Sequence, residues 1–167
     1  MRVLNSNIAS KSATRFLRFP DFGNLQWLHA RFKNQKFAPH YHDGHVIGMI
    51  EDGALGFNYL GESVVAAPGQ INIADPGEVH NGFAKSDAGW QYRMFYLSPG
   101  QLNSMCRGIN GEKYAQPYFG AGVITDKDLA QKLRQLHFDF AQDQVSWLEK
   151  ESRFLDLMIQ LVSRYTK

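Results

Sequence analysis

Short apolar stretches separated by turn residues fill the first hundred positions of the chain. Six of them have the length and the alternating or continuous apolar pattern of strands. They lie at 25–32, 45–51, 54–60, 63–67, 70–74 and 90–98. The connections contain Gly, Asp and Pro, which tight turns prefer, and the two-residue link at 61–62 is typical of a hairpin. Many short strands at this spacing predict a mainly β sandwich or barrel.

Helical periodicity replaces this pattern toward the end of the chain. Residues 107–117 contain Gly and Asn and predict a loop, and 118–124 predicts one more strand. One helix is then expected over about 125–143, with Thr125 as its cap, and a second over about 146–165. The sequence therefore predicts that the β domain is followed by two consecutive amphipathic helices.

Each predicted helix carries an apolar face. In the first helix the face consists of Leu129, Leu133, Leu136 and Phe140, and in the second of Leu148, Leu155, Met158, Leu161, Val162 and Tyr165. Such a face can pack against its own domain. Alternatively it forms the seam of a homodimer, because two helices appended to a barrel leave apolar surface for a second copy to cover. Both alternatives stay open, and we treat 125–167 as a two-helix dimerisation segment with the first face at the seam.

The composition is that of one globular domain. The 167 residues are 44% apolar, 13% aromatic and 20% charged, and a chain of this length can bury a substantial core. The net charge is +2, and the 18 Lys and Arg residues are scattered rather than clustered. Direct DNA binding by these residues is therefore not expected, because nucleic-acid-binding surfaces carry a clustered basic patch.

The cellular compartment is predicted from what the sequence lacks. Cys106 is the only cysteine, so an internal disulfide cannot form, which fits a reducing compartment. The first residues lack the apolar core of a signal peptide, and no stretch of about 18 apolar residues follows. We therefore expect a cytoplasmic protein without a membrane partner. Residues 1–14 show no periodicity and are expected to form a flexible N-terminal arm.

Three of the six histidines, His40, His42 and His45, lie within six residues. Because side chains alternate between the two faces of a strand, His40 and His42 are expected on one face and His45 on the other. His80, from another segment, can face the same cavity. Three imidazoles suffice for a zinc or iron(II) site if water or a ligand completes the coordination. A metal-free polar pocket and plain surface histidines are the alternatives. The remaining histidines are expected to be solvated or hydrogen-bonded: His29, His45 and His137.

The spacing around these histidines resembles the second half of the first cupin motif, G-x5-H-x-H-x(3,4)-E-x6-G. His40 and His42 supply the H-x-H, and Gly53 supplies the last glycine. Val46 stands where the motif has its metal-binding Glu. An apolar residue thus replaces the only anionic ligand of the motif. This weakens the case for a metal, because three neutral imidazoles do not compensate the charge of a divalent ion.

The second cupin motif, G-x5-P-x-G-x2-H-x3-N, is also matched in part. His80 takes its histidine position, with Gly69 and Gly77 at the required spacing. Asp75 occupies the proline position and Ala84 the asparagine position. The resemblance implies that the three histidines meet inside a barrel, and that a bound divalent metal such as Zn, Ni or Fe would use them as ligands.

A narrower resemblance covers most of the chain. The segments PHYHDGHVIGMIEDGALGFNYLGE (39–62), AAPGQINIADPGEVHNG (66–82) and GWQYRMFYLSP (89–99) are together similar to the N-terminal effector-binding and dimerisation domain of AraC-type transcription regulators. The resemblance implies a cupin-type double-stranded β-helix, or jelly-roll barrel, at 15–124, followed by two C-terminal α-helices. It also implies a helix-turn-helix DNA-binding domain, which is absent from this chain.

The same resemblance implies a ligand pocket inside the barrel. Its candidate lining residues are His40, His42, His80, Trp90, Tyr92 and Met94. The last three alternate along one strand and share a face, which leaves Arg93 and Phe95 on the other. An aromatic floor with a few polar groups suits a sugar or another small organic metabolite.

We therefore predict a small-molecule-sensing and dimerising module of a transcription regulator, which is not an enzyme and needs no cofactor. It would contact DNA only through the absent C-terminal domain. The alternative is a metal-dependent cupin enzyme, a dioxygenase or an isomerase, with Zn, Ni or Fe on the three histidines. Val46 at the Glu position and the lack of a second carboxylate or a Tyr at motif spacing favour the sensor.

Overall fold

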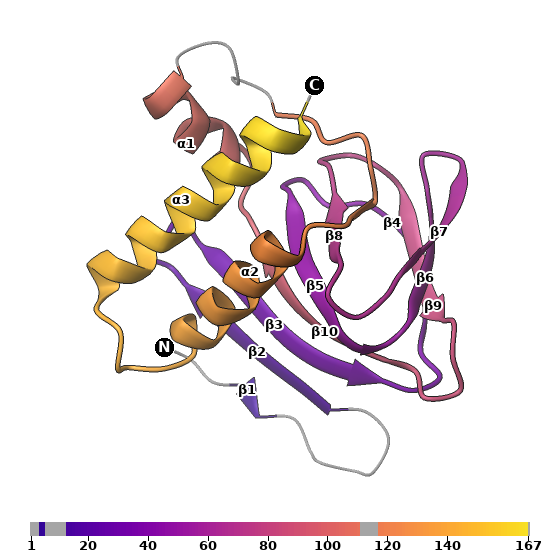
Figure 1. The fold of residues 1–167 in the computed structure, drawn as a ribbon. Helices are drawn as coiled ribbons and strands as arrows, with labels where there is room; N and C mark the ends of the chain where they lie inside the picture. The colour runs from indigo at the N-terminus through magenta and orange to yellow at the C-terminus, as the bar shows by residue number, and fades with distance from the viewer. Residues whose placement is uncertain (1–3, 6–12, 111–116, 167) are drawn as a thin grey trace.

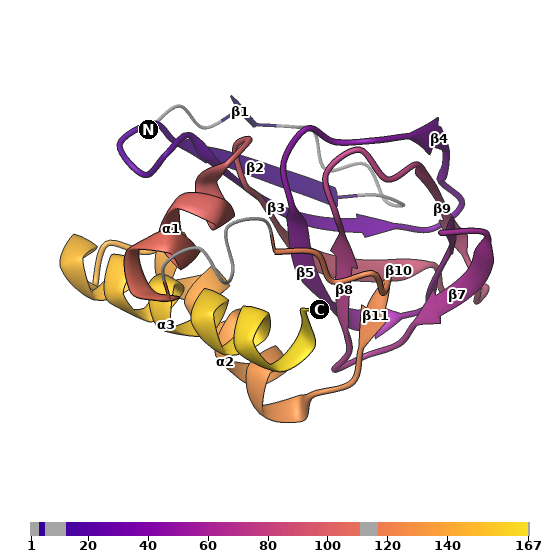
Figure 2. The same ribbon diagram turned by 90° about the horizontal axis from the view of Figure 1, so that it is seen from above.

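The computed structural model describes residues 4–5, 13–110 and 117–166. Two antiparallel sheets face each other and form a barrel, and three helices lie on the outside of one sheet (Figure 1 and Figure 2). The jelly-roll barrel and the two C-terminal helices expected from the sequence are thereby confirmed. In the described part of the chain, no helix combines the length and the apolar character needed to span a membrane.

The larger sheet has seven strands. In spatial order they are β1 (Leu4–Asn5), β2 (Ala13–Phe19), β3 (Leu25–Phe32), β10 (Trp90–Tyr96), β5 (Val46–Gly53), β8 (Ile71–Ala74) and β11 (Val123–Ile124). The central strand, β10, pairs antiparallel with β3 on one side and with β5 on the other. The predicted strand over 118–124 is wrong for most of its length, because only its last two residues pair, with β8.

The smaller sheet has four strands. In spatial order they are β4 (Lys36–His40), β9 (His80–Ala84), β6 (Leu55–Tyr59) and β7 (Glu62–Ala66). The predicted hairpin is confirmed, but its two-residue link is 60–61 and not 61–62, because Glu62 already pairs with Tyr59. Four strands, β1, β2, β4 and β9, were not predicted. In β4 and β9 most side chains are only half-buried or exposed, so the apolar alternation that reveals a strand is missing.

Little of the predicted N-terminal arm is described. Leu4 and Asn5 pair with Phe16 and Arg15 of β2, and residues 13–14 already belong to β2. The other residues of the arm lie outside the described part of the chain. The described arm residues therefore extend the edge of the larger sheet.

The three helices are α1 (Gln101–Asn110), α2 (Lys127–Phe140) and α3 (Trp147–Tyr165). The first occupies part of the predicted loop, where Gly108 and Asn110 suggested irregular structure. Its Leu102 and Cys106 are buried against the sheet and lie one helical turn apart. A helix was therefore missed because two turn-forming residues near its end outweighed a short apolar repeat.

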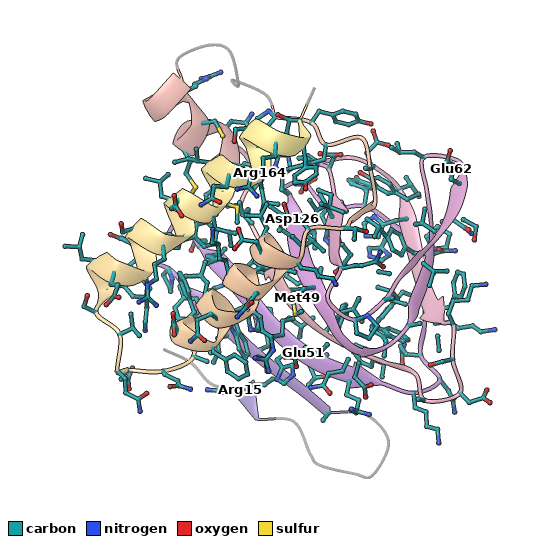
Figure 3. All side chains as sticks on the ribbon, in the orientation of Figure 1. Arg15, Met49, Glu51, Glu62, Asp126 and Arg164 are labelled. Atoms are coloured by element: carbon teal, nitrogen blue, oxygen red, sulfur yellow. The ribbon has the colours of Figure 1, made fainter. Side chains whose placement is uncertain are left out.

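The cap of α2 is Asp126 and not Thr125, because the Asp126 carboxylate accepts a hydrogen bond of 3.0 Å from the backbone N–H of Leu129. The same carboxylate binds Arg164 at 3.1 Å and Tyr165 at 2.8 Å, and Figure 3 shows Asp126 and Arg164 side by side. Asp126 thus ties the start of α2 to the end of α3. The second of the two helices predicted from the sequence is α3. It begins after its cap Ser146, at the expected start of about 146.

The predicted dimer seam on α2 is corrected by burial within the single chain. Leu129, Leu133, Leu136 and Phe140 are between 0% and 2% exposed and pack in one cluster with the sheet and α3. They cover their own domain, so they are not available to a second copy. On α3 the predicted face is shifted: Leu148 is 76% exposed, whereas the buried apolar residues are Phe154, Leu157, Met158, Leu161 and Val162.

The larger sheet is buried on both faces. Its outer face and the helices enclose one hydrophobic cluster, and its inner face and the smaller sheet enclose a second. Alternation along β10 places Phe95 in the outer cluster and Trp90, Tyr92 and Met94 in the inner one. The inner cluster is the interior of the barrel, where the candidate site lies.

Candidate functional site

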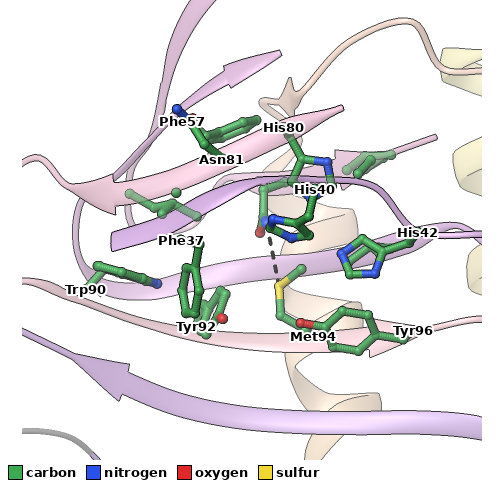
Figure 4. Close-up of a pocket in the computed structure, with 16 residues that line it drawn as sticks. Phe37, His40, His42, Phe57, His80, Asn81, Trp90, Tyr92, Met94 and Tyr96 are labelled. Atoms are coloured by element: carbon green, nitrogen blue, oxygen red, sulfur yellow. Dashed lines mark hydrogen bonds between the residues drawn. The ribbon is translucent and has the colours of Figure 1, made fainter. Parts of the chain in front are cut away.

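A cavity of about 70 Å³ opens inside the barrel (Figure 4). It is lined by apolar and aromatic side chains with a few polar groups among them. The lining residues are Phe37, His40, His42, Val46, Leu55, Phe57, Asn72, Ile73, Ala74, His80, Asn81, Gly82, Trp90, Tyr92, Met94 and Tyr96. All six pocket residues expected from the sequence are among them, so the structure brings the predicted residues together.

Three of these residues form a cluster that we call the histidine triad: His40, His42 and His80. One ring nitrogen of each lies within 4.8 Å of those of the other two. His40 ends β4 and stands opposite His80 at the start of β9, with ring centroids 4.5 Å apart. His42 follows in the next loop, with its ring centroid 5.1 Å from that of His40 and 5.2 Å from that of His80. The convergence predicted from the H-x-H spacing and the distant His80 is therefore confirmed.

Backbone carbonyls fix the orientation of two triad rings. His40 Nδ1 lies 2.8 Å from the Ala38 carbonyl oxygen, and His80 Nδ1 lies 3.0 Å from the Glu78 carbonyl oxygen. A carbonyl only accepts hydrogen bonds, so each Nδ1 carries the proton. In the neutral ring the other nitrogen, Nε2, then has a free lone pair.

Two rings of the triad, His42 and His80, are held neutral at physiological pH. Burial, followed by the charges of His80 and His40, lowers the pKa of His42 to about 4. Burial also lowers the pKa of His80, against a raising effect of its hydrogen bond to the Glu78 carbonyl. Neutral imidazoles are the form that accepts hydrogen bonds or binds a metal ion.

Strand β10 supplies the aromatic floor of the pocket. Trp90, Tyr92 and Met94 point into the cavity, and Tyr96 continues the series (Figure 4). Burial raises the pKa of Tyr96 to about 12, so its hydroxyl stays protonated. Gly48 on β5 stands opposite Met94. A Cβ at that position would lie 2.1 Å from the Met94 sulfur, so the glycine leaves the space that Met94 fills.

Two buried polar atoms in the pocket wall have no hydrogen-bond partner among the described residues: Asn72 Oδ1 and Trp90 Nε1. Asn72 is 8% exposed and Trp90 is 1% exposed. The Asn72 amide nitrogen makes only a 3.5 Å contact with the Met94 sulfur, drawn as a dashed line in Figure 4. Leaving a buried donor or acceptor unpaired is costly, so these atoms stand out as groups that a bound molecule would satisfy.

Val46 lines the cavity at the position where the cupin motif has its carboxylate ligand. None of the lining residues in the described part of the chain is Asp, Glu, Lys or Arg. The site therefore offers three imidazoles, amides, phenols and an indole, but no charged group. Such a set can bind a small polar molecule, and its three imidazoles can hold a divalent metal without neutralising its charge.

Sequence reasoning missed several lining residues. Tyr96 follows Trp90, Tyr92 and Met94 at the same alternation and could have been found by continuing the count. Asn72 is the one polar residue in the apolar run of β8, which marked it as unusual. The others lie on strands whose partners are distant in the sequence, and no local pattern identifies them: Phe37, Leu55, Phe57, Ile73, Ala74, Asn81 and Gly82.

The other histidines lie outside the triad, as expected. His45 is buried, and its Nε2 lies 3.0 Å from the Pro117 carbonyl oxygen. In His137 both ring nitrogens have partners, Nδ1 with Arg93 at 3.2 Å and Nε2 with the Leu28 carbonyl oxygen at 3.0 Å. His29 Nε2 lies 3.3 Å from a Glu51 carboxylate oxygen. These rings serve the packing of the sheet and helices.

Two of the solved structures to which the chain is similar are described as cupins. A cupin superfamily protein from Desulfitobacterium hafniense DCB-2 is 10% identical with a TM-score of 0.45, and the match covers 55% of this chain and 83% of that chain. The cupin 2 conserved barrel domain protein from Leptotrichia buccalis is 17% identical with a TM-score of 0.47, and the match covers 56% of this chain and 44% of that chain.

Sequence comparison points to transcription regulators. YbfI of Bacillus subtilis (strain 168), an uncharacterized HTH-type transcriptional regulator, is 29% identical over 138 residues. The match covers 81% of this chain and 50% of that protein, so the chain spans half the length of this relative. The family model of the AraC-like ligand binding domain matches residues 22–158. The chain belongs to the family of AraC-like ligand-binding domains.

Proposed function

We propose that this chain is the effector-sensing domain of a transcription regulator, which binds a small organic molecule inside its barrel and catalyses no reaction. The observation that carries the proposal is the pocket itself. Residues far apart in the sequence, the histidine triad and the β10 aromatics, meet around one cavity inside the barrel. A small, largely apolar cavity with a few convergent polar groups is the usual form of a ligand site.

The composition of the pocket supports a binding role over a catalytic one. Its described lining contains no carboxylate, amine or thiol that could act as general acid, general base or nucleophile beside the imidazoles. The orphan atoms, which are the unpaired Asn72 Oδ1 and Trp90 Nε1, would hold a ligand by hydrogen bonds and would not transform it. A bound molecule should therefore be recovered unchanged.

The proposal is tested by a thermal-shift screen of the purified chain against small metabolites, followed by calorimetry on the compounds that stabilise it. We expect saturable binding that is lost in His80→Ala and in Trp90→Ala. A Leu148→Ala variant, altered at an exposed residue of α3, should bind as the wild type does. Recovery of a chemically altered compound after incubation would instead show an enzyme.

A divalent metal on the triad is the second candidate, and one observation favours it. The Nδ1 atoms of His40 and His80 are anchored to backbone carbonyls, which is how proteins orient metal-binding imidazoles. His40, His42 and His80 would hold Zn, Ni or Fe, and such a metal would supply a Lewis acid at the pocket. Val46 provides no anionic ligand, so the fit is incomplete.

Elemental analysis of protein purified without added metal separates the two candidates. We expect much less than one metal ion per chain, and no loss of thermal stability in a chelator. Stoichiometric metal, with a chelator-induced fall in melting temperature that His80→Ala abolishes, would favour the metal site and reopen the enzyme alternative.

We also propose that the chain forms a homodimer, through a surface other than the buried face of α2. The start of α3 exposes apolar side chains: Leu148 is 76% exposed and Trp147 is 38% exposed. Sedimentation at high micromolar concentration should show a dimer that Leu148→Glu dissociates. Val65→Glu, at a 44% exposed residue of β7, is the matched control. A monomeric wild-type chain would refute the proposal.

DNA binding in this proposal comes from a helix-turn-helix domain outside the chain. The support is the curated relative, an HTH-type transcriptional regulator of which this chain matches half. The regulator would act in the cytoplasm, where bacterial DNA is found. A fusion of the chain to such a domain should change its DNA affinity when the pocket is filled.

A further inference from the structure

We propose that the histidine triad recognises hydrogen-bond donors, so that the effector is an uncharged molecule with hydroxyl or amide groups, and that carboxylates and phosphates are rejected. The inference rests on the proposed sensing function and narrows its effector class. It follows from the direction of hydrogen bonds in the pocket, from the absence of charge in the described lining, and from two unpaired atoms in the wall.

The direction of the hydrogen bonds is fixed by the backbone. His40 and His80 each donate through Nδ1 to a carbonyl oxygen, at 2.8 Å and 3.0 Å. Their remaining ring nitrogens can only accept while the rings are neutral. The two rings stand 4.5 Å apart, so their two acceptor nitrogens share a small volume, beside His42, whose neutral ring has one donor and one acceptor nitrogen. A molecule bound there must bring hydrogen-bond donors.

The same pocket is unfavourable for an anion. Its oxygens carry lone pairs, which the triad lone pairs repel, and a buried anion needs a cation or several donors around it. The described lining contains neither Lys nor Arg. The nearest buried arginine, Arg93 of β10, lies on the outer face and pairs with Glu51 at 2.7 Å. The pocket therefore offers a carboxylate or a phosphate no cation, and only neutral donors such as the Trp90 indole N–H and the Tyr92 and Tyr96 hydroxyls.

The two orphan atoms define what the rest of the ligand must offer. Trp90 Nε1 is a donor without an acceptor, and Asn72 Oδ1 is an acceptor without a donor, among the described residues. A hydroxyl or a primary amide can donate and accept at once, whereas a carboxylate can only accept. An alcohol or amide therefore satisfies both atoms, and a carboxylate leaves Asn72 unpaired.

The size of the cavity limits the ligand further. Its 70 Å³ corresponds to roughly five water molecules at about 10–15 Å³ each. This suits a small alcohol, polyol or amide. The first probes are accordingly matched pairs in which each terminal hydroxymethyl group is replaced by a carboxylate: propane-1,2-diol with lactate, erythritol with tartrate, and benzyl alcohol with benzoate.

The orientation of the triad is tested without any ligand. Long-range ¹H–¹⁵N NMR of the histidine rings at pH 7.5 distinguishes a ring protonated on Nδ1 from one protonated on Nε2. We expect His40 and His80 to be Nδ1-protonated, with His80→Gln and His40→Gln used for assignment. If either ring carries its proton on Nε2, the triad presents a donor to the pocket, and the inference is wrong.

The ligand pairs are tested by thermal shift and calorimetry at pH 7.5, in a chelator and again with zinc. We expect the neutral member of a pair to stabilise the metal-free protein and its carboxylate partner not to. Trp90→Phe and Asn72→Leu should each raise the dissociation constant of the bound neutral compound about tenfold. Trp27→Phe, which makes the same change where the indole N–H already donates to the His137 carbonyl, should leave it unchanged.

The outcomes separate this inference from the proposed function. A carboxylate that binds the metal-free protein as well as its neutral partner would overturn the inference and leave the sensor intact. A carboxylate that binds only with zinc would also overturn it, because the triad would then serve a metal. If neither these probes nor the metabolite screen yields a ligand, the sensor proposal fails. The NMR result still decides whether His40 and His80 present acceptor nitrogens to the pocket.

Discussion

The polar side chains on the two faces of the larger sheet differ in whether the chain supplies their partners. On the outer face, Glu51 pairs with Arg93 at 2.7 Å and with Arg134 at 2.9 Å, and Arg93 also reaches His137. On the inner face, the orphan atoms of Asn72 and Trp90 have no partner among the described residues. Both faces are buried, so exposure does not explain the difference. The charges of the outer face are paired within the chain, although Arg93 Nε, 2.7 Å from Glu51, makes no hydrogen bond among the described residues. On the inner face the unpaired atoms belong to neutral groups, for which a ligand is the proposed partner.

The histidines show the same contrast. His137 uses both ring nitrogens within the chain. His40 and His80 each use one for a backbone carbonyl and keep the other toward the cavity. A buried histidine is therefore better judged by how many of its nitrogens the chain satisfies than by its burial. By this criterion we regard His137 as structural and propose a ligand-binding role for the triad.

The largest effect is expected from breaking the ion-pair group on the outer face. Although burial raises the pKa of Glu51, hydrogen bonding and charge from Arg93 outweigh it and hold the pKa below its usual value. Glu51→Gln leaves Arg93, which is 4% exposed, without its counter-charge. We expect a loss of about 3–5 kcal/mol in the free energy of unfolding, measured by urea denaturation.

Its control is the neighbouring carboxylate on the same strand. Asp52 pairs with Arg31 at 2.8 Å, with both side chains about half exposed. Asp52→Asn should cost less than about 1 kcal/mol. Equal losses in the two variants would show that the outer-face group is no more than a surface ion pair.

The next effect concerns Asp75, whose carboxylate fixes the segment that leads to α2. It accepts hydrogen bonds from the backbone N–H groups of Phe119 at 2.9 Å and Gly120 at 3.0 Å, and from the Tyr59 hydroxyl at 3.0 Å. Asp75→Asn replaces one acceptor oxygen by a donor that faces another donor. We expect a loss of about 2–3 kcal/mol and faster hydrogen exchange at the Phe119 and Gly120 amides.

Glu78→Gln is the comparison for Asp75→Asn. Glu78 accepts a hydrogen bond from the exposed hydroxyl of Tyr118 at 3.1 Å, so its change should cost less than about 1 kcal/mol. Unchanged exchange at Phe119 and Gly120 in Asp75→Asn would mean that the backbone of this segment is held by other contacts.

Much of this arrangement was predictable from local sequence patterns. The rest was not predictable, and the physical reasons can be named. The β10 face was predicted because alternation is strict from Trp90 to Tyr96. The pairing of His40 with His42 was predicted for the same reason, and His80 was found through the spacing of the second cupin motif. Asp75 was recognised only as a departure from that motif, because its partners, including Phe119 and Gly120, lie far along the chain.

The face of α2 shows where sequence reasoning stops. Leu129, Leu133, Leu136 and Phe140 were correctly predicted to share one apolar face, but the sequence does not say what covers it. The structure buries that face against the same chain. An apolar stripe gives the orientation of a helix, whereas its partner depends on the path of the whole chain.

The outer face also predicts a pH dependence. Burial, followed by the charge of Arg93, lowers the pKa of His137 well below its usual value. Between pH 6.5 and 5 the unfolded chain therefore takes up a proton at His137 that the folded chain does not. The contribution of His137 to the free energy of unfolding is fully present above about pH 6.5. It falls as the pH decreases, by at most about 1.4 kcal/mol per pH unit.

The contribution of His137 is isolated by its Gln variant. His137→Gln should be less stable at pH 7.5, because Arg93 and the Leu28 carbonyl lose their imidazole partner, but its stability should fall less between pH 6.5 and 5, by up to about 2 kcal/mol. His42, His80 and His45, whose pKa values are also lowered, remain and keep the rest of the acid dependence. An unchanged slope would show that His137 is protonated in the folded protein.

The smallest expected effect gives the sharpest test of the difference between the two faces. The same substitution, Trp to Phe, is made once on each face. The Trp27 indole N–H donates to the His137 carbonyl oxygen at 2.7 Å, whereas the Trp90 N–H has no partner in the described part of the chain. Both rings are 1% exposed. Trp27→Phe and Trp90→Phe remove a similar volume, so the cavity costs are similar.

The difference between these variants then reports the hydrogen bond. We expect Trp27→Phe to lose about 1 kcal/mol more than Trp90→Phe in urea denaturation without ligand, because only the first change leaves a buried carbonyl without its donor. Equal losses would mean that the Trp90 N–H already has a structural partner in solution. The inner face would then be as complete as the outer one, and the reason for regarding its polar atoms as reserved for a ligand would be gone.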